Sequence, residues 1–461
     1  MERVLPKTLD YTDVLPLAVE SRARRRTFFP VNGQTFTSGG ANVIRIDISA
    51  DSLLDTQHSY LRFTFKTKTR DAGIDYAGGH SFIRRLRIEQ SGTVLEDINS
   101  YNRLMGAVVL PCQSSDEHHK ERTITEGVRG KSQTSAGSAG SILNMAATAA
   151  GALQGTQLQN NDDNQIQVAG DATIQTYDFC IPLNSGIFNN DKLIPLMLMS
   201  APLTIEIELA NSIQPVIYAT SATGTYEISN VRYVANLVEV GQDVAQQLRM
   251  VQELSGGVLT LAGQTYRHFT GAVTTGTGDQ IINVPARVKS MKSMFFVGQG
   301  AGSDAFDTFD VSCGFNNSLH EYQLKIGSVV YPPTPIRCNF ADGSQSEVSN
   351  HRSEAFMELA KSWGNVGSTK GLGQLNWFNW NSAKSVRTGS EEQIIFGPMG
   401  LDLEAFQRVA IESGVNTADR SLPISLILNY SEAPVAMNYD IFVLADALFY
   451  INGDGSMSVS V

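Results

Sequence analysis

The sequence holds few residues of the kinds that carry redox, metal or nucleophilic chemistry. Its four cysteines are far apart and form no CxxC pair, so they predict neither a zinc site nor a disulfide framework. None of its seven histidines belongs to an HxH or HExxH motif, and no GxSxG segment occurs. We therefore expect no bound metal, no cofactor and no enzymatic activity.

Long apolar runs are missing as well. No segment approaches the roughly 20 apolar residues that span a bilayer, and the best candidate, residues 193–203, contains Pro195 and Pro202. Residues 2–10 carry charges of both signs and no apolar core, so we expect a chain made without a secretory signal peptide. The formal net charge of -11 argues against a body that coats nucleic acid or an anionic membrane, because such surfaces need clustered Lys and Arg.

Positive charge gathers in one place near the N-terminus. Arg22, Arg24, Arg25 and Arg26 follow a segment with scattered apolar residues. This asymmetry predicts an N-terminal arm over residues 1–30 whose arginines contact an acidic partner, which could be a lipid surface, a nucleic acid or a neighbouring subunit. A solvated tail is the alternative interpretation.

Most of the remaining chain has the pattern of β-strands, and hydrophobic residues, 42% of the total, suffice for large cores. The clearest strand lies at 203–209, where Leu203, Ile205, Ile207 and Leu209 alternate with Thr and Glu, the period of a strand with one buried face. Further strands are predicted at 42–49, 59–68, 82–98, 177–183, 224–241, 265–273, 279–298, 321–332, 391–397, 422–430 and 438–461.

Short helices and one long loop interrupt this pattern. Apolar spacing predicts helices at 97–109, 241–254, 353–363 and 401–410. Between about 111 and 172 the sequence becomes rich in Ser, Gly, Ala, Gln, Asn and Asp without periodicity, which indicates a long excursion from one end of the first β domain. The helix at 241–254 is predicted to connect a domain at 31–240 to a second domain at 241–461.

The two halves repeat the same order of predicted elements. A hairpin followed by a helix occurs at 86–105 and at 322–363, and a strand, a Gly-containing break, an apolar turn and an alternating strand occur at 177–209 and at 393–430. The offset is 424 - 203 = 221 residues between Ile424 and Leu203, and 397 - 183 = 214 between Gly397 and Leu183. A period of about 220 residues indicates duplicated domains. About eight strands per half predict an all-β protein of two tandem eight-stranded jelly rolls, with short helices and long loops.

Several segments together resemble the double jelly-roll major capsid proteins of DNA viruses. They are the basic N-terminal segment, the long loop, IPLNSGIFNNDKLIPL followed by APLTIEIEL, the hairpin YQLKIGSVVYP and the closing DIFVLADALFYINGDG. The resemblance implies a structural protein of the virion that self-assembles as homotrimeric, pseudo-hexagonal capsomers into an icosahedral capsid. It also implies contacts with neighbouring capsomers and with penton or minor capsid proteins, an internal membrane as partner of the N-terminal arm, and no sequence-specific binding of nucleic acid.

Two other functions remain open at this point. A carbohydrate- or receptor-binding β-sandwich protein, such as a spike, would bind its ligand through exposed aromatic residues. A bicupin-type enzyme would need an HxH motif and a following Glu in each roll, which the sequence lacks. Trp363, Trp377, Phe378 and Trp380 are candidates either for partner contacts or for core residues.

A second arginine cluster, Arg84, Arg85 and Arg87, lies within a predicted strand. Alternation places Arg85 and Arg87 on one face and Arg84 with Leu86 on the other. The cluster is interpreted either as a face for acidic loops of a neighbouring subunit or as a solvated strand face.

Overall fold

A computed structural model provides the fold of the chain. It describes residues 21–67, 72–75, 77–114, 122, 124–127, 175–211, 214–218, 226–276, 278–300, 311–312, 314, 316, 319–338, 352–366, 372–373, 375, 380, 397–405, 414–430, 434 and 436–461. Residues 1–20 of the predicted arm, nearly all of the predicted strand at 391–397 and most of the predicted long loop lie outside this set.

The first half of the chain forms two main antiparallel sheets. Its strands are β1 (Ser21–Phe28), β2 (Thr35–Thr37), β3 (Val43–Ile48), β4 (Leu53–Thr67), β5 (Ala72–Ile74), β6 (Ile83–Gln90), β7 (Thr93–Asn99), β8 (Gln175–Ile181), β9 (Ile194–Pro195), β10 (Leu203–Leu209), β11 (Val216–Tyr218) and β12 (Tyr226–Val240). Its helical segments are η2 (Gly78–Phe82), α1 (Tyr101–Arg103), the π-helix η3 (Leu104–Val109), α2 (Leu110–Gln113) and η4 (Leu196–Leu198).

Helix α6 (Gln242–Leu254) leads into the second half, which again contains two antiparallel sheets. The strands there are β13 (Val258–Val273), β14 (Gly278–Asn283), β15 (Met291–Gly300), β16 (Leu319–Ile326), β17 (Val329–Arg337), β18 (Met399–Asp402), β19 (Ile424–Tyr430), β20 (Met437–Asn452) and β21 (Met457–Ser460). Helix α7 (Arg352–Ser362) lies between β17 and β18.

One strand order builds both halves. In the first half the sheets run β1-β12-β4-β8 and β3-β10-β6-β7, and in the second they run β13-β20-β15-β18 and β14-β19-β16-β17. Each half thus has eight strands in these two sheet orders. When those eight are numbered along the chain, both halves give 1-8-3-6 in one sheet and 2-7-4-5 in the other. This is the topology of a jelly roll, and it confirms the prediction of two tandem eight-stranded rolls. Leu203 and Ile424, matched in the sequence repeat, each begin the seventh strand of their roll.

The alternation seen in the sequence determines which side of each strand is buried. Ile205 of β10 lies opposite Ile46 of β3 and Ile88 of β6, and all three side chains are fully buried. The next residue, Glu206, points to the other face, where it lies opposite Arg87. Apolar side chains therefore fill the roll while oppositely charged cross-strand pairs cover its outer face.

The structure differs from the predicted arm over residues 1–30. Residues Ser21–Phe28 form β1, which pairs with β12 from Ser21 opposite Val240 to Phe28 opposite Tyr233. Because β1 is the first of the eight strands, a roll that began at residue 31 would be incomplete. The strand carries many charges because it lies at the edge of its sheet, where charged side chains also discourage unwanted strand pairing.

The predicted helices have mixed outcomes. The helices at 241–254 and 353–363 are confirmed as α6 and α7. The helix predicted at 97–109 begins later, because residues up to Asn99 belong to β7. The helix predicted at 401–410 is wrong at its start, since Leu401 and Asp402 pair with β15 as part of β18.

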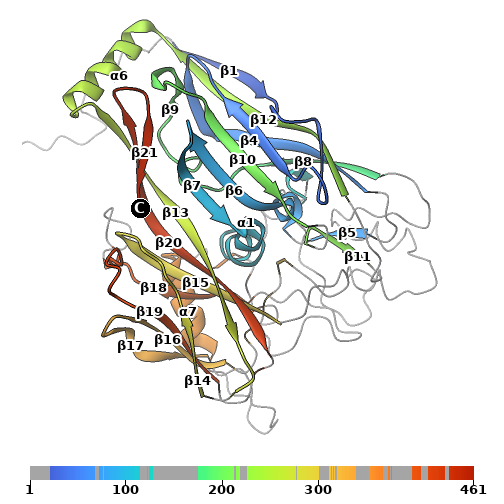
Figure 1. Ribbon diagram of the computed structural model, residues 1–461, viewed down its shortest axis with the longest axis vertical. Coiled ribbons are helices and arrows are strands. Elements are labelled where there is room, and N and C mark those ends of the chain that lie inside the picture. The colour runs from blue at the N-terminus through green and yellow to red at the C-terminus, as the bar shows by residue number, and fades with distance from the viewer. Residues whose placement is uncertain are drawn as a thin grey trace, which may run out of the picture.

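The two rolls lie side by side, with the long strands β13 and β20 along their boundary (Figure 1). Helix α6 lies at one end of the molecule and β14 near the opposite end. Buried apolar residues of both rolls form one continuous core cluster. We call the boundary between the rolls the seam.

Candidate assembly surfaces

A buried ion pair crosses the seam. Arg103, at the end of α1, has a side chain only 5% exposed, and its Nε lies 3.1 Å from Oδ2 of Asp440 on β20. The same guanidinium donates to the carbonyls of Val311 at 2.6 Å and Gly298 at 3.5 Å. His268 Nε2 lies 2.8 Å from the other oxygen of Asp440. Burial opposes ionisation of Asp440, but His268 and Arg103 outweigh it and lower its pKa, so this carboxylate stays charged.

Backbone also packs directly against backbone across the seam. A Cβ added to Gly263 of β13 would lie 2.6 Å from the carbonyl oxygen of Gly186, and one added to Gly186 would lie 2.5 Å from that of Gln264. Glycine is therefore required for this approach. The Gly186 N–H donates to Oε1 of Glu96 at 2.9 Å, and burial raises the pKa of Glu96 in spite of that bond.

Side-chain amides add further bonds between the rolls. Asn190, in the Gly-containing break that the sequence placed between two strands, donates to the carbonyl of Ala262 at 2.8 Å. Gln90, at the end of β6, donates to the carbonyl of Gly455 at 3.0 Å and accepts from the N–H of Met457 at 2.5 Å. The first roll is thus bonded to both β13 and the β20–β21 hairpin of the second.

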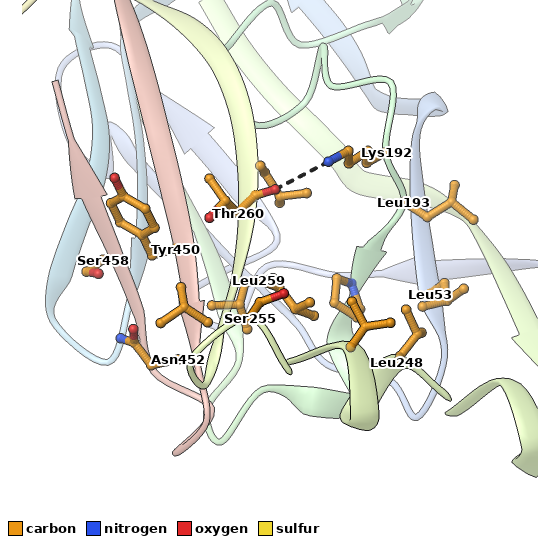
Figure 2. Close-up of a pocket in the computed structure, with 15 residues that line it drawn as sticks. Leu53, Lys192, Leu193, Leu248, Ser255, Leu259, Thr260, Tyr450, Asn452 and Ser458 are labelled. Carbon is orange, nitrogen blue, oxygen red and sulfur yellow. Dashed lines mark hydrogen bonds between the residues drawn. The ribbon is translucent and has the colours of Figure 1, made fainter. Parts of the chain in front are cut away.

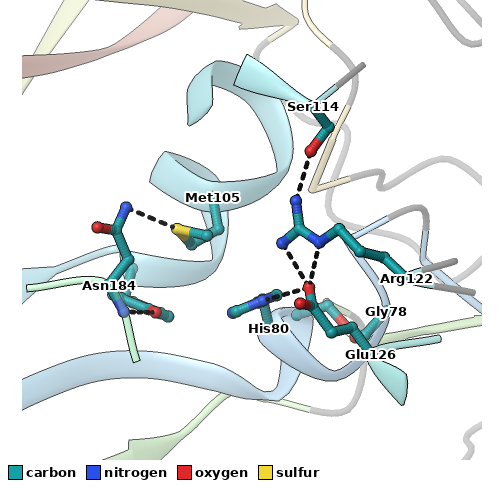
Figure 3. Close-up of polar contacts among 9 residues, drawn as sticks. Gly78, His80, Met105, Ser114, Arg122, Glu126 and Asn184 are labelled. Atoms are coloured by element: carbon teal, nitrogen blue, oxygen red, sulfur yellow. Dashed lines mark hydrogen bonds and ion pairs between the residues drawn. The ribbon is translucent and has the colours of Figure 1, made fainter. Parts of the chain in front are cut away.

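A buried charge cluster lies at the described base of the predicted long loop. His80 Nε2 is 3.0 Å from Oε2 of Glu126, and Arg122 Nε donates to the same oxygen at 2.7 Å. Arg122 also donates to the hydroxyl of Ser114 (Figure 3). Burial opposes ionisation, yet the bond from His80 and the charge of Arg122 lower the pKa of Glu126 to about 2. The cluster links Ser114, directly after α2, and His80 to Arg122 and Glu126.

The four arginines of the predicted contact site all lie on β1: Arg22, Arg24, Arg25 and Arg26. Their side chains are exposed, and alternation places Arg25 on the face opposite the other three. Arg24 lies 3.0 Å from Glu239, Arg25 donates to the hydroxyl of Tyr60 at 3.1 Å, and Arg26 covers the ring of Phe28 at 5.0 Å. The structure therefore presents these charges on one strand of the first roll.

The second arginine cluster finds its acidic partners within its own sheet. Arg85 donates two hydrogen bonds, of 2.7 and 2.6 Å, to the carboxylate of Asp97, and this hydrogen bonding raises the pKa of Arg85. Arg84 lies 3.5 Å from Glu208 and is exposed, so it does not share the buried face of Leu86 as the alternation predicted. These pairs explain the cluster without a neighbouring subunit.

Trp363 and Trp380 both pack against the apolar core, with Trp380 buried and Trp363 half-buried. Trp363 stacks on Phe295 with ring centroids 4.6 Å apart. Trp380 is 3% exposed, and its indole N–H donates to a backbone carbonyl at 3.0 Å. The core interpretation therefore applies to both, while Trp377 and Phe378 lie outside the described residues.

Neither a metal-binding cluster nor a membrane-crossing helix occurs among the described residues. No group of three or more His, Cys, Asp or Glu side chains among them is placed to hold a metal ion. In the same part of the chain, no helix combines the length and the apolar character needed to cross a membrane.

Comparison with known proteins gives matches of fold. No family model and no curated protein matches the sequence. VP54 of PBCV-1 aligns over 98% of this chain and 99% of its own, with a TM-score of 0.59 at 10% identity. The mavirus major capsid protein aligns over 99% and 95%, with a TM-score of 0.54 at 12% identity. The Faustovirus major capsid protein aligns over 95% and 92%, with a TM-score of 0.54 at 9% identity.

The strand order and these nearly full-length alignments define the chain as a double jelly-roll protein. Its fold is that of the major capsid proteins of mavirus and Faustovirus, so the fold implied by the sequence resemblance is confirmed.

Proposed function

We propose that this chain is a viral major capsid protein, a structural component of the virion that self-assembles as trimeric, pseudo-hexagonal capsomers into an icosahedral shell. The observation that carries the proposal is the pair of rolls with one strand order, joined within one chain by a buried seam. The fold shared with the mavirus and Faustovirus capsid proteins supports the same role.

The architecture suits such an assembly for a geometric reason. Three copies of a chain with two similar rolls supply six similar units around a three-fold axis, and a ring of six has the outline that packs with neighbours in a plane. The Arg103–Asp440 pair and the Gly186–Gly263 contact fix one roll against the other within each chain. Assembly therefore does not have to order the rolls relative to each other, a cost that association otherwise carries.

The proposed partners are copies of the chain itself, neighbouring capsomers, and penton or minor capsid proteins. The four arginines of β1 are exposed, and they suit an acidic partner. That partner is an internal membrane, the genome or a neighbouring subunit, and binding to nucleic acid would be independent of sequence.

The proposal treats the chain as a structural protein and not as an enzyme. The rival function, a carbohydrate- or receptor-binding spike, needs exposed aromatic side chains. Trp380 is instead buried and the half-buried Trp363 stacks on Phe295, which supports the structural role.

The mass of the purified chain in solution, measured by light scattering, tests the proposal. A trimer has a mass of 3 × 50.1 = 150.3 kDa. We expect this mass over a wide range of concentrations, because obligate interfaces bury large apolar areas. A chain that keeps a mass of 50.1 kDa at high concentration would contradict the capsomer and favour the spike.

A further inference from the structure

An open apolar groove lies at the end of the molecule that carries α6. Its volume is about 1010 Å³, and its walls come from α6, from the first roll and from β13, β20 and β21 of the second. Leu53, Leu193, Leu248, Val251 and Leu259 supply much of its lining. Figure 2 shows Leu53, Leu193 and Leu248 gathered on one side of it, with Leu259 nearer the middle.

Helix α6 leaves apolar side chains uncovered beside this groove. Met250, Val251 and Leu254 are 53%, 49% and 88% exposed. Leu248 and Val251, one turn apart, form the part of the groove wall that α6 supplies. The helix is anchored by the buried amide of Gln252, which donates at 3.1 Å to the carbonyl of Ile451 on β20, another residue that lines the groove. A contiguous apolar surface of this kind marks a contact site.

The N-terminal segment is attached to the described chain close to helix α6. Strand β1 runs antiparallel to β12, and its first residue, Ser21, lies opposite the last residue of β12, Val240. Helix α6 begins directly afterwards, at Gln242. Ser21, to which residues 1–20 are attached, therefore lies close to the point where α6 begins.

We propose that residues 5–17 of the same chain lie in this groove and cover the exposed apolar side chains of α6. The segment offers a matching set of apolar residues: Leu5, Tyr11, Val14, Leu15 and Leu17. Burying these side chains against the groove removes apolar surface of both partners from water.

Length and tethering favour the same chain as the source of the segment. Twenty extended residues reach about 66–72 Å at roughly 3.3–3.6 Å each. The 13 residues of α6 cover only about 20 Å at a rise of 1.5 Å per residue. A segment attached at Ser21 can thus follow the whole helix. The tether also gives it an effective concentration that a segment from another copy lacks.

Cysteine crosslinking in the full-length chain tests this placement. Leu15→Cys combined with Val251→Cys should form a link within one chain when treated with a short bismaleimide. The matched control combines Leu15→Cys with Ile281→Cys, because Ile281 is a 68% exposed apolar residue on β14, at the opposite end of the molecule. Peptide mass spectrometry identifies the linked residues, and the gel mass distinguishes one chain from two. No link between positions 15 and 251 above the control level, or a link only between two chains, would overturn the proposal.

Limited trypsin digestion gives a second readout that needs no crosslinker. Trypsin cleaves after Lys7, inside the proposed bound segment, and a docked segment is protected in proportion to the time it spends bound. Val251→Asp places a charge in the apolar groove and should speed this cleavage several-fold. Ile281→Asp, which places the same charge far from the groove, should leave the rate unchanged. Equal rates in the two variants would count against the proposal.

Discussion

Arg103 and Asp440 lie 337 residues apart in the sequence, and their side chains meet at 3.1 Å across the seam between the two rolls. Each residue belongs to a different roll, so the pair links the position of one roll to that of the other. His268 binds the second oxygen of Asp440, so each oxygen of this largely buried carboxylate has its own partner.

Replacing Arg103 should be costly because it leaves Asp440 without its main cationic partner. Breaking a buried pair by removing one side typically costs 3–5 kcal/mol, so we expect Arg103→Met to lower the unfolding free energy by about 3 kcal/mol or more. Arg84→Met is the control, because Arg84 pairs with Glu208 on the exposed face and such pairs contribute about 1 kcal/mol at most. Urea denaturation measures the unfolding free energy of both variants. Similar losses in the two would contradict a larger contribution of the buried pair.

The Gly186–Gly263 contact predicts an effect of a single methyl group. Gly263→Ala would force the methyl to within 2.6 Å of the Gly186 carbonyl oxygen, so the rolls must separate locally. Overpacking of this kind costs about 1–3 kcal/mol. Gly39→Ala serves as control, since an added Cβ there meets no atom within 4 Å. A melting temperature equally changed in both variants would contradict the close contact.

The charge cluster at the base of the predicted long loop predicts a specific acid sensitivity. The pKa of Glu126 is about 2 in the folded chain, against an ordinary value of 4.5. Between these values the unfolded chain binds more protons, so the stabilisation is complete above pH 4.5 and is lost as the pH falls toward 2. Glu126→Gln removes this pH-dependent contribution to the unfolding free energy, which is up to about 3 kcal/mol. The difference in unfolding free energy between wild type and variant should shrink through that window. A difference that stays constant with pH would refute the assignment.

The exposed arginines of β1 predict salt-dependent binding to an anionic partner. We expect the triple variant Arg22→Gln, Arg24→Gln, Arg26→Gln to bind anionic vesicles on the order of 100-fold more weakly, since each arginine near such a surface contributes about 1 kcal/mol. Vesicle flotation, DNA binding and the mass of the assembly, measured in parallel, distinguish membrane, genome and subunit as the partner. Arg84→Gln is the matched exposed control. A triple variant that is unchanged in all three measurements would contradict an acidic partner, and the β1 arginines would then only be solvated.

The sequence predicted those parts of the fold that depend on local pattern. Leu203–Leu209 alternates strictly, and the structure places its apolar residues inward between β3 and β6. Helix α6 follows from apolar spacing in the same way. Strand β1 was missed because its exposed arginines have no apolar alternation, and only its pairing with β12 makes it part of the sheet.

The contacts of the seam could not be predicted, because they depend on register between distant strands. Arg103 looked like an ordinary residue of a short helix, and nothing near it in the sequence indicates Asp440. The sequence indicates the break at Gly186, Asn189 and Asn190, but the contact of Gly186 with Gly263 exists only once two complete rolls have formed. The groove beside α6 likewise combines residues from both halves.

The central claim is that three copies of this chain place six rolls around a common axis, and electron cryomicroscopy of the purified particle tests it most directly. The account predicts class averages with a near-hexagonal outline and a reconstruction with three-fold symmetry in which two rolls with the 1-8-3-6 strand order belong to each chain. Particles that contain one chain only, or assemblies whose rolls do not surround a three-fold axis, would contradict it.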